Sequence, residues 1–255
     1  MSVETAIVTG AASGIGALAV RRMRNQGIHV LAADRNPAIV TQYAADDGIK
    51  AVAADVTVAD ECAELVEIAE RTFGHVDRLF HSAGIMPGGA IADMPTEQIL
   101  QVMNVNYGGT VNMTKAVLPG MRKLAAAEII VLGSLTGYVP SQRLGAYSAS
   151  KAAVNTYIET LAREERQGGV HVLLVAPNAV KTPLLSQTTG GPKMIEKMSR
   201  QSSSRLMISP EDVLDAIERA LKKKESVIKP GGKPMHALRR LSPALTWFLA
   251  DMADR

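Results

Sequence analysis

Short apolar and β-branched runs alternate with longer amphipathic segments along this chain, and this alternation restricts the fold more than any other feature. Strands and helices that alternate in sequence are joined by right-handed crossovers and form a parallel sheet with helices on both faces. The 255 residues show no break in composition, so we expect one domain over 1–255, an α/β fold with a doubly wound parallel sheet. Strands are predicted at Val3–Thr9, Ile28–Ala33, Ile49–Ala53, Leu79–His81, Ile129–Leu132 and Val170–Ala176. Helices are predicted at Gly14–Asn25, Ala59–Thr72, Thr96–Lys123, Ala146–Gln167 and Pro210–Lys223.

Composition excludes several classes of function. The net charge is only +3, and much of the basic excess lies in Lys222-Lys-Lys224 and Arg239-Arg240, so we expect no nucleic-acid partner. The single cysteine, Cys62, excludes an intrachain disulfide and a Cys-rich metal site, and we expect no metal. We identify no signal peptide and no membrane span, and we expect a cytoplasmic location.

Two segments fall outside the regular pattern. The irregular stretch 182–207 is too long for an ordinary connection, and segments of that kind are usually lids or disordered. The tail 230–255 carries enough apolar side chains to pack on the body or on a partner. Its basic, amphipathic character also fits peripheral contact with a membrane, which we consider the weaker interpretation.

A glycine-rich turn follows the first predicted strand in the sequence Gly10-Ala-Ala-Ser13-Gly14-Ile15-Gly16. Glycines permit a tight turn and a close approach of the backbone to a pyrophosphate, and the following helix offers free N–H groups to phosphate oxygens. A structural turn would be as common for the glycines alone. Their position after a first strand favours a dinucleotide site.

Acidic residues at the ends of the next two strands support that interpretation. Asp34 ends the second strand, where a carboxylate can accept hydrogen bonds from both adenosine ribose hydroxyls and would repel a 2′-phosphate. Arg35 could instead attract that phosphate or stack on the adenine, but we expect NAD, with NADP the weaker candidate. Asp55 and Val56 end the third strand at the same edge, although Asp55 could also cap a helix. Ala83 and Gly84, after the fourth strand, would let a cofactor lie close.

Tyr147 and Lys151 lie four residues apart, and Ser134 precedes them by thirteen residues. Residues at i and i+4 share one face of a helix, so a phenol and an ammonium can meet at one point. A cation near a tyrosine favours the phenolate and brings its pKa toward the range of a general acid or base. The pair alone is a common helix spacing; its chemistry becomes specific only beside a dinucleotide site.

With these motifs in register, the whole chain resembles the classical short-chain dehydrogenase/reductase family, whose fold is a Rossmann-type sheet. The resemblance implies a catalytic tetrad of Ser134, Tyr147, Lys151 and Asn106. It also implies that Tyr147 transfers the proton, that Lys151 holds the nicotinamide ribose, and that Pro177, Val180 and Thr182 meet the nicotinamide carboxamide. Two departures occur: His81-Ser82 replaces the usual Asn-Asn, and Asn178 replaces the glycine after Pro177.

The resemblance implies hydride transfer between the cofactor and a secondary alcohol or ketone, and homo-oligomers formed through the helices at Thr96–Lys123 and Ala146–Gln167. We expect an apolar substrate, steroid-, terpenoid- or aryl-like, contacted by Met86–Ala92, Leu135, Tyr138, Val139 and the lid. Recognition of an anionic group by basic residues of the lid is less favoured: Lys193, Lys197, Arg200 and Arg205.

Two rival functions remain on the same fold. A lyase or dehalogenase is weakly favoured, because relatives with that chemistry usually lose the glycine pattern and the lysine. A non-catalytic dinucleotide sensor or scaffold is the main alternative, although a sensor would not need Ser134 together with Tyr147.

Overall fold

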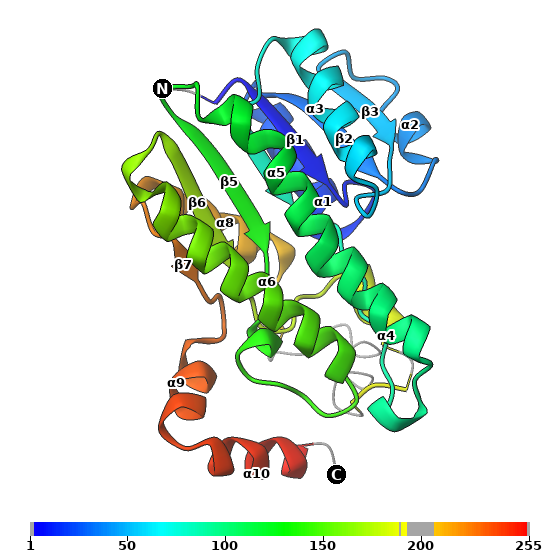
Figure 1. The fold of residues 1–255 in the computed structure, drawn as a ribbon, viewed down its shortest axis with the longest axis vertical. Helices are drawn as coiled ribbons and strands as arrows, with labels where there is room; N and C mark the ends of the chain where they lie inside the picture. The colour runs from blue at the N-terminus through cyan, green and yellow to red at the C-terminus, as the bar shows by residue number, and fades with distance from the viewer. Residues whose placement is uncertain (1–2, 189, 193–206, 254–255) are drawn as a thin grey trace.

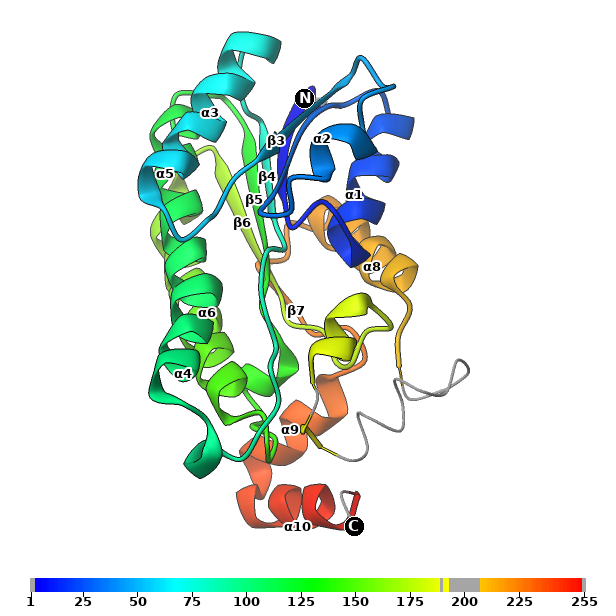
Figure 2. The same cartoon turned by 90° about the vertical axis from the view of Figure 1, so that its right-hand side faces the viewer.

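The computed structural model describes residues 3–188, 190–192 and 207–253, and its centre is a seven-stranded sheet covered by helices on both faces (Figure 1, Figure 2). The strand order is β3-β2-β1-β4-β5-β6-β7, and every pairing is parallel. The order reverses between β1 and β4, and ligands of such sheets bind beyond the carboxyl ends of the strands at that point. This confirms the predicted doubly wound fold. The strands are β1 Thr5–Thr9, β2 His29–Asp34, β3 Ile49–Ala53, β4 Arg78–His81, β5 Ala127–Leu132, β6 Val170–Val175 and β7 Val227–Ile228.

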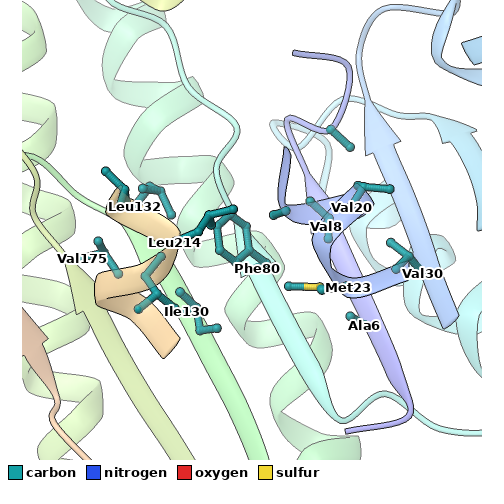
Figure 3. Packing of buried hydrophobic residues seen from close by; sticks show 14 of the residues in the cluster. Ala6, Val8, Val20, Met23, Val30, Phe80, Ile130, Leu132, Val175 and Leu214 are labelled. Atoms are coloured by element: carbon teal, nitrogen blue, oxygen red, sulfur yellow. The ribbon is translucent and has the colours of Figure 1, made fainter. Parts of the chain in front are cut away.

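The helices divide between the two faces of the sheet because successive strand side chains point in opposite directions. Ile7 packs in the cluster that contains residues of α3, α5 and α6, whereas Val8 packs in the cluster of α1 and α8. Figure 3 shows Phe80 of β4 near the centre of the second cluster, with Met23 on one side and Leu214 on the other. The main helices are α1 Gly14–Asn25, α3 Ala59–Phe73, α4 Thr96–Met103, α5 Gly109–Met121, α6 Gly145–Glu164 and α8 Pro210–Lys222.

One predicted helix is not regular. The segment Thr96–Lys123 was expected as a single α-helix, but a π-helical turn at Asn104–Gly108 separates α4 from α5. The hydroxyl of Thr110, at the start of α5, donates to the carbonyl of Asn106 within this turn at 2.6 Å. Single π-turns inside helices often occur at functional sites, where they redirect a side chain.

The chain also contains short elements that the sequence pattern did not predict. These are α2 Ile39–Gln42, strand β7, and two C-terminal helices, α9 Lys233–Leu241 and α10 Pro243–Ala253. Figure 2 shows α9 and α10 beyond the carboxyl edge of the sheet, the edge where ligands are expected. The predicted packing of the tail is partial, because Thr246 is buried while Leu241 is exposed.

The predicted lid lies partly within the described residues. Residues 182–188 follow β6 and include a short 3₁₀ helix at Pro183–Gln187, while 189 and 193–206 lie outside the described residues. The four basic side chains considered for anion recognition fall in that second stretch: Lys193, Lys197, Arg200 and Arg205. Among the helices of the described residues, none is long and apolar enough to cross a bilayer.

Candidate active site

A cavity of about 620 Å³ runs along the carboxyl edge of the sheet. It extends from the glycine-rich turn, past the ends of β2 and β3, to the residues that follow β5 and β6. Every predicted cofactor residue and three of the four predicted catalytic residues line it; the fourth, Asn106, does not. The lining residues among those predictions are Gly10, Ser13, Gly14, Ile15, Gly16, Asp34, Arg35, Asp55, Val56, Ala83, Gly84, Ser134, Tyr147, Lys151, Pro177, Val180 and Thr182.

Close packing requires glycine at Gly10, in the turn after β1, and at Gly16, in the first turn of α1. Gly10 has φ +65°, and a Cβ there would lie 2.8 Å from the backbone nitrogen of Ala83. A Cβ on Gly16 would lie 2.2 Å from the carbonyl oxygen of Gly10. The close packing brings the N-terminus of α1 to the cavity, where its free N–H groups and positive dipole end favour an anion.

Asp34 is fixed at the far end of this cavity by two backbone groups. Its Oδ2 accepts from the N–H of Ala12 at 3.1 Å, and its Oδ1 accepts from the N–H of Asn36 at 2.9 Å. A carboxylate has about four lone-pair sites, so both oxygens can still accept hydrogen bonds from a diol. The exposed Arg35 lies beside it at the edge of the cavity.

Asp55 follows β3 but does not begin a helix. Its Oδ1 accepts from the N–H of Thr57 at 2.8 Å, while the N-cap position of α3 is Val58. The helix-cap interpretation of Asp55 is therefore wrong. Val56 packs against the backbone of Gly109, where a Cβ would lie 2.6 Å from its Cγ2.

Tyr147 and Ser134 meet inside the cavity wall. Tyr147 lies on the first turn of α6 and is 5 % exposed, and Ser134 follows β5 and is 8 % exposed. Burial raises the pKa of the Tyr147 phenol to about 12, while the hydrogen bond with Ser134 opposes the rise. The Ser134 hydroxyl is also held by Thr136, whose Oγ1 donates to it at 2.9 Å. Tyr147 is therefore a neutral, buried phenol at physiological pH.

Lys151 lies one helical turn beyond Tyr147. Its Nζ donates to the carbonyl of Leu132 at 2.7 Å and lies 5.9 Å from the centroid of the Tyr147 ring. Burial lowers the pKa of the Lys151 ammonium to about 8. We expected this ammonium to lower the pKa of Tyr147, but in this arrangement burial raises that pKa. The contact that opposes the rise is the hydrogen bond with Ser134, not Lys151.

The Asn106 side chain holds the loop that follows β4. Its Oδ1 accepts from the N–H of Ile85 at 2.8 Å, and its Nδ2 donates to the carbonyl of Ile85 at 3.0 Å and to Ser150 Oγ at 2.9 Å. Gly84 lies between Asn106 and Lys151, since a Cβ there would be 3.0 Å from Asn106 Oδ1 and 3.8 Å from Lys151 Nζ. Asn106 thus joins α6 to the cavity-lining loop.

Asn155 is a site residue that the sequence reasoning missed. Its Nδ2 donates to the carbonyl of Ser134 at 3.0 Å, and its Oδ1 accepts from the Ser134 N–H at 3.4 Å. Gly133 and Gly137 leave the room it needs, because a Cβ at either would lie within 2.5 Å of its carboxamide. The available signal was helical spacing: Asn155 lies four residues after Lys151, on the same face of α6.

Tyr138 differs from its prediction, whereas His81 agrees with its prediction. Tyr138 was expected to meet the substrate, but its hydroxyl donates to Glu159 of α6, and it is not among the cavity-lining residues. His81 is buried, as expected for a structural histidine, and its Nδ1 bonds Thr9 Oγ1 at 2.8 Å. Its Nε2 has no partner within the part of the chain that the structure describes.

The segment after β6 closes the nicotinamide end of the predicted site. The carbonyl of Pro177 accepts from the N–H of Leu135 at 2.9 Å, Val180 pairs with Ile208 as an isolated bridge, and Thr182 lies against Gly14. Over the described residues, no group of three or more His, Cys, Asp or Glu side chains is arranged to hold a metal.

Comparison with known proteins gives consistent matches. The sequence model of the family described as short chain dehydrogenase matches residues 4–192. An uncharacterized oxidoreductase of Staphylococcus saprophyticus is 34 % identical over 230 residues, which is 88 % of this chain and 93 % of the relative. One from Staphylococcus aureus strain MRSA252 is 32 % identical over 221 residues, covering 86 % and 90 %.

Solved structures show the same fold. A short chain dehydrogenase/reductase from Burkholderia phymatum, crystallised with NAD, superimposes with a TM-score of 0.84 at 24 % identity and covers 96 % of this chain and 95 % of its own. Ligand-free aldohexose dehydrogenase of Thermoplasma acidophilum gives a TM-score of 0.77 at 21 % identity, covering 90 % and 93 %.

Proposed function

This chain belongs to the short-chain dehydrogenase family of oxidoreductases, and from that premise we propose that it transfers a hydride between a nicotinamide dinucleotide and an apolar secondary alcohol or ketone. One observation carries the proposal: a single cavity is lined by the glycine turn at one end and by the buried Ser134–Tyr147 pair at the other. A sensor would need only the first of these.

The residues present fit a dinucleotide. The packing at Gly10 and Gly16 admits no side chain, so the backbone of this turn stays open to a pyrophosphate at the N-terminus of α1. Asp34 would accept from the adenosine ribose hydroxyls and would repel a 2′-phosphate, so NAD is proposed over NADP, as in the bound Burkholderia structure. Pro177, Val180 and Thr182 would bind the carboxamide end.

The bound nicotinamide would supply or accept the hydride at its C4 carbon. Tyr147 would give a proton to the substrate oxygen during reduction, or take it during oxidation, and Ser134 would hold that oxygen by a hydrogen bond. With its pKa raised to about 12, Tyr147 keeps its proton in the free enzyme and can donate it during carbonyl reduction. Lys151 uses one donor on Leu132 and has two left for the nicotinamide ribose hydroxyls.

The substrate end of the cavity is apolar. Met86, Leu135, Val139, Leu144 and Leu185 line it, so an apolar alcohol or ketone would lose little hydrogen bonding on entry. Residues 182–207 are proposed as the lid over this end, within a single domain over 1–255. We further propose a cytoplasmic homo-oligomer assembled through α4, α5 and α6.

Asn106 is proposed to act by position. Its side chain is hydrogen-bonded to Ile85 and Ser150. It would therefore hold the loop after β4 and the π-turn in position and would not contact the substrate. The family resemblance also implies a water between Asn106 and Lys151, and we include this water in the proposal.

A screen of NADH and NADPH consumption over a panel of ketones, with the reverse reaction over alcohols, tests the proposal. We expect consumption of NADH with at least one apolar ketone. NADH or NADPH binding without turnover of any carbonyl or alcohol would instead identify a dinucleotide sensor, and failure of both cofactors to bind would remove both functions.

A further inference from the structure

The C-terminal hairpin α9–α10 supplies three side chains to the cavity, although it follows the last strand of the sheet. Met235 of α9 and Thr246 and Leu249 of α10 line the same cavity as Tyr147. β7 is the edge strand opposite β3, so the hairpin approaches from the end farthest from Asp34. It therefore lies at the substrate end rather than at the adenosine end.

We infer that the α9–α10 hairpin is the wall that selects the substrate by length, and that Leu249 is the residue an elongated apolar ketone or alcohol meets farthest from its reacting carbon. This inference rests on the proposed function and names the substrate class more narrowly. An extended chain is favoured over a compact one because the hairpin adds apolar lining beyond the residues around Ser134 and Tyr147.

The hairpin is anchored to the turn that carries Ser134. Tyr138 ends this turn, and its hydroxyl donates to Glu159. Lys229, just before the hairpin, lies with its Nζ 4.6 Å from the centroid of the Tyr138 ring, and the ring of His236 meets Tyr138 edge-on at 4.8 Å. Cation–π and edge-to-face contacts of this geometry are attractive.

The first turn of the hairpin also packs directly on a cavity residue. A Cβ on Gly232 would lie 2.9 Å from Leu135 Cδ1, so the backbone of the hairpin touches a side chain that lines the cavity beside Ser134. The segment that positions the Ser134 hydroxyl thus also positions the wall.

The two helices of the hairpin are joined to each other. The guanidinium of Arg239 in α9 lies 5.4 Å from the centroid of the Trp247 ring in α10. The hydroxyl of Thr246 donates to the Ser242 carbonyl at 3.0 Å, so this buried side chain brings no unpaired donor to the cavity. An apolar substrate segment can therefore contact Thr246 without leaving its hydroxyl donor unpaired.

Neighbouring residues on α10 provide a matched control. Leu249 is 39 % exposed and lines the cavity, whereas Phe248 is 59 % exposed and is not among the cavity-lining residues. Truncation of Leu249 would remove a contact with the substrate, and truncation of Phe248 would remove a larger side chain from the same helix without touching the cavity.

The test uses the full chain with methyl ketones of increasing length, from butanone to undecanone, and NADH. For Leu249→Ala we expect KM for undecanone to rise about tenfold, with KM for butanone and the Kd of NADH unchanged. Phe248→Ala should leave all three unchanged. Tyr138→Ala, which removes the anchor, should raise amide exchange in 233–249 together with KM for undecanone.

Direct binding of undecanone, measured by calorimetry, separates this inference from the proposed function. Tight binding to the wild type that Leu249→Ala weakens supports the wall even if no ketone is reduced, in which case the proposed oxidoreductase activity fails alone. Ketone reduction with a length profile that Leu249→Ala does not alter overturns the wall and leaves the proposed function intact. No binding of undecanone to the wild type also overturns the inference.

Discussion

The carboxamide of Asn155 holds the main chain of Ser134 from both sides, with Nδ2 on its carbonyl at 3.0 Å and Oδ1 on its N–H at 3.4 Å. Lys151 and Tyr147 precede Asn155 on the same helix by four and eight residues, so one face of α6 presents Tyr147 and Lys151 and also fixes the backbone of Ser134. The relative position of the three catalytic candidates therefore depends on a residue that need not contact the substrate.

Substitution of Asn155 by Leu tests this positioning role. The buried N–H of Ser134 would lose its partner, which costs about 1–3 kcal/mol, and Ser134 would shift relative to Tyr147. We expect kcat to fall about tenfold to a hundredfold, because small displacements of reacting groups are costly, while the Kd of NADH stays the same. The exposed Thr156 on the same helix gives a control, Thr156→Ala, for which kcat should not change. An equal loss of NADH binding in Asn155→Leu would indicate general disruption instead.

Substitution of Gly16 by Ala is expected to remove cofactor binding. The new Cβ would lie 2.2 Å from the Gly10 carbonyl and 2.7 Å from Ser82 Oγ, so the turn must open, at a cost of about 2 kcal/mol. NADH titration by fluorescence and a denaturant melt measure the two effects. Gly168→Ala serves as the control, because its Cβ would make only ordinary contacts from 3.5 Å. Unchanged NADH affinity in Gly16→Ala would contradict the dinucleotide turn.

Cofactor preference is expected to depend on Asp34. In Asp34→Ser the repulsion of a 2′-phosphate is lost and Arg35 remains, so the ratio of kcat/KM for NADPH to that for NADH should rise by about tenfold or more. The exposed Asp47 lies outside the cavity, and Asp47→Ser should leave the ratio unchanged. A wild type that already prefers NADPH would refute the role assigned to Asp34.

His81 is expected to make the fold sensitive to acid. Burial, and to a smaller extent Lys151, lowers the pKa of His81 to about 3 from 6.5. The folded state keeps His81 neutral while the unfolded chain binds a proton below pH 6.5, so this contribution to stability is present above pH 6.5 and is lost as pH falls toward 3.

The variant His81→Asn should therefore take up about one proton fewer than the wild type on unfolding near pH 5. Denaturant titration at several pH values gives the free energy of unfolding of each protein. The difference between the two slopes of this free energy against pH gives the difference in protons taken up. Parallel slopes for the two proteins would show that His81 is protonated in the folded state.

The sequence predicted the parts of this molecule that local pattern controls. The alternation of strand and helix patterns, together with the positions of the glycines, was enough to predict the parallel sheet, the turn at Gly10 and the end of β2 at Asp34. The bounds of α9 and α10 were not predicted, although Pro234 and Pro243 stand in the first turns of the two helices, where proline is favoured. Elements as short as β7 carry too few residues to show a period.

Features that depend on tertiary contacts could not be predicted. The lowered pKa of Lys151 follows from its burial. The side chain of Tyr138 points toward Glu159, twenty-one residues away in the sequence. The role of Asn155 depends on Gly133 and Gly137, which leave room for its carboxamide. The cavity-lining position of Leu249 depends on how the tail folds back over the sheet edge.

Transfer of the label from NADH deuterated at C4 tests hydride transfer by this site most directly. The ketone that is consumed fastest would be incubated with each of the two C4-deuterated isomers, and the alcohol product would be analysed by mass spectrometry for wild type and Tyr147→Phe. We expect deuterium on the carbinol carbon from one isomer, and a rate that falls about a hundredfold or more in Tyr147→Phe while NADH still binds. A product without deuterium from either isomer, or an undiminished rate in Tyr147→Phe, would contradict this expectation.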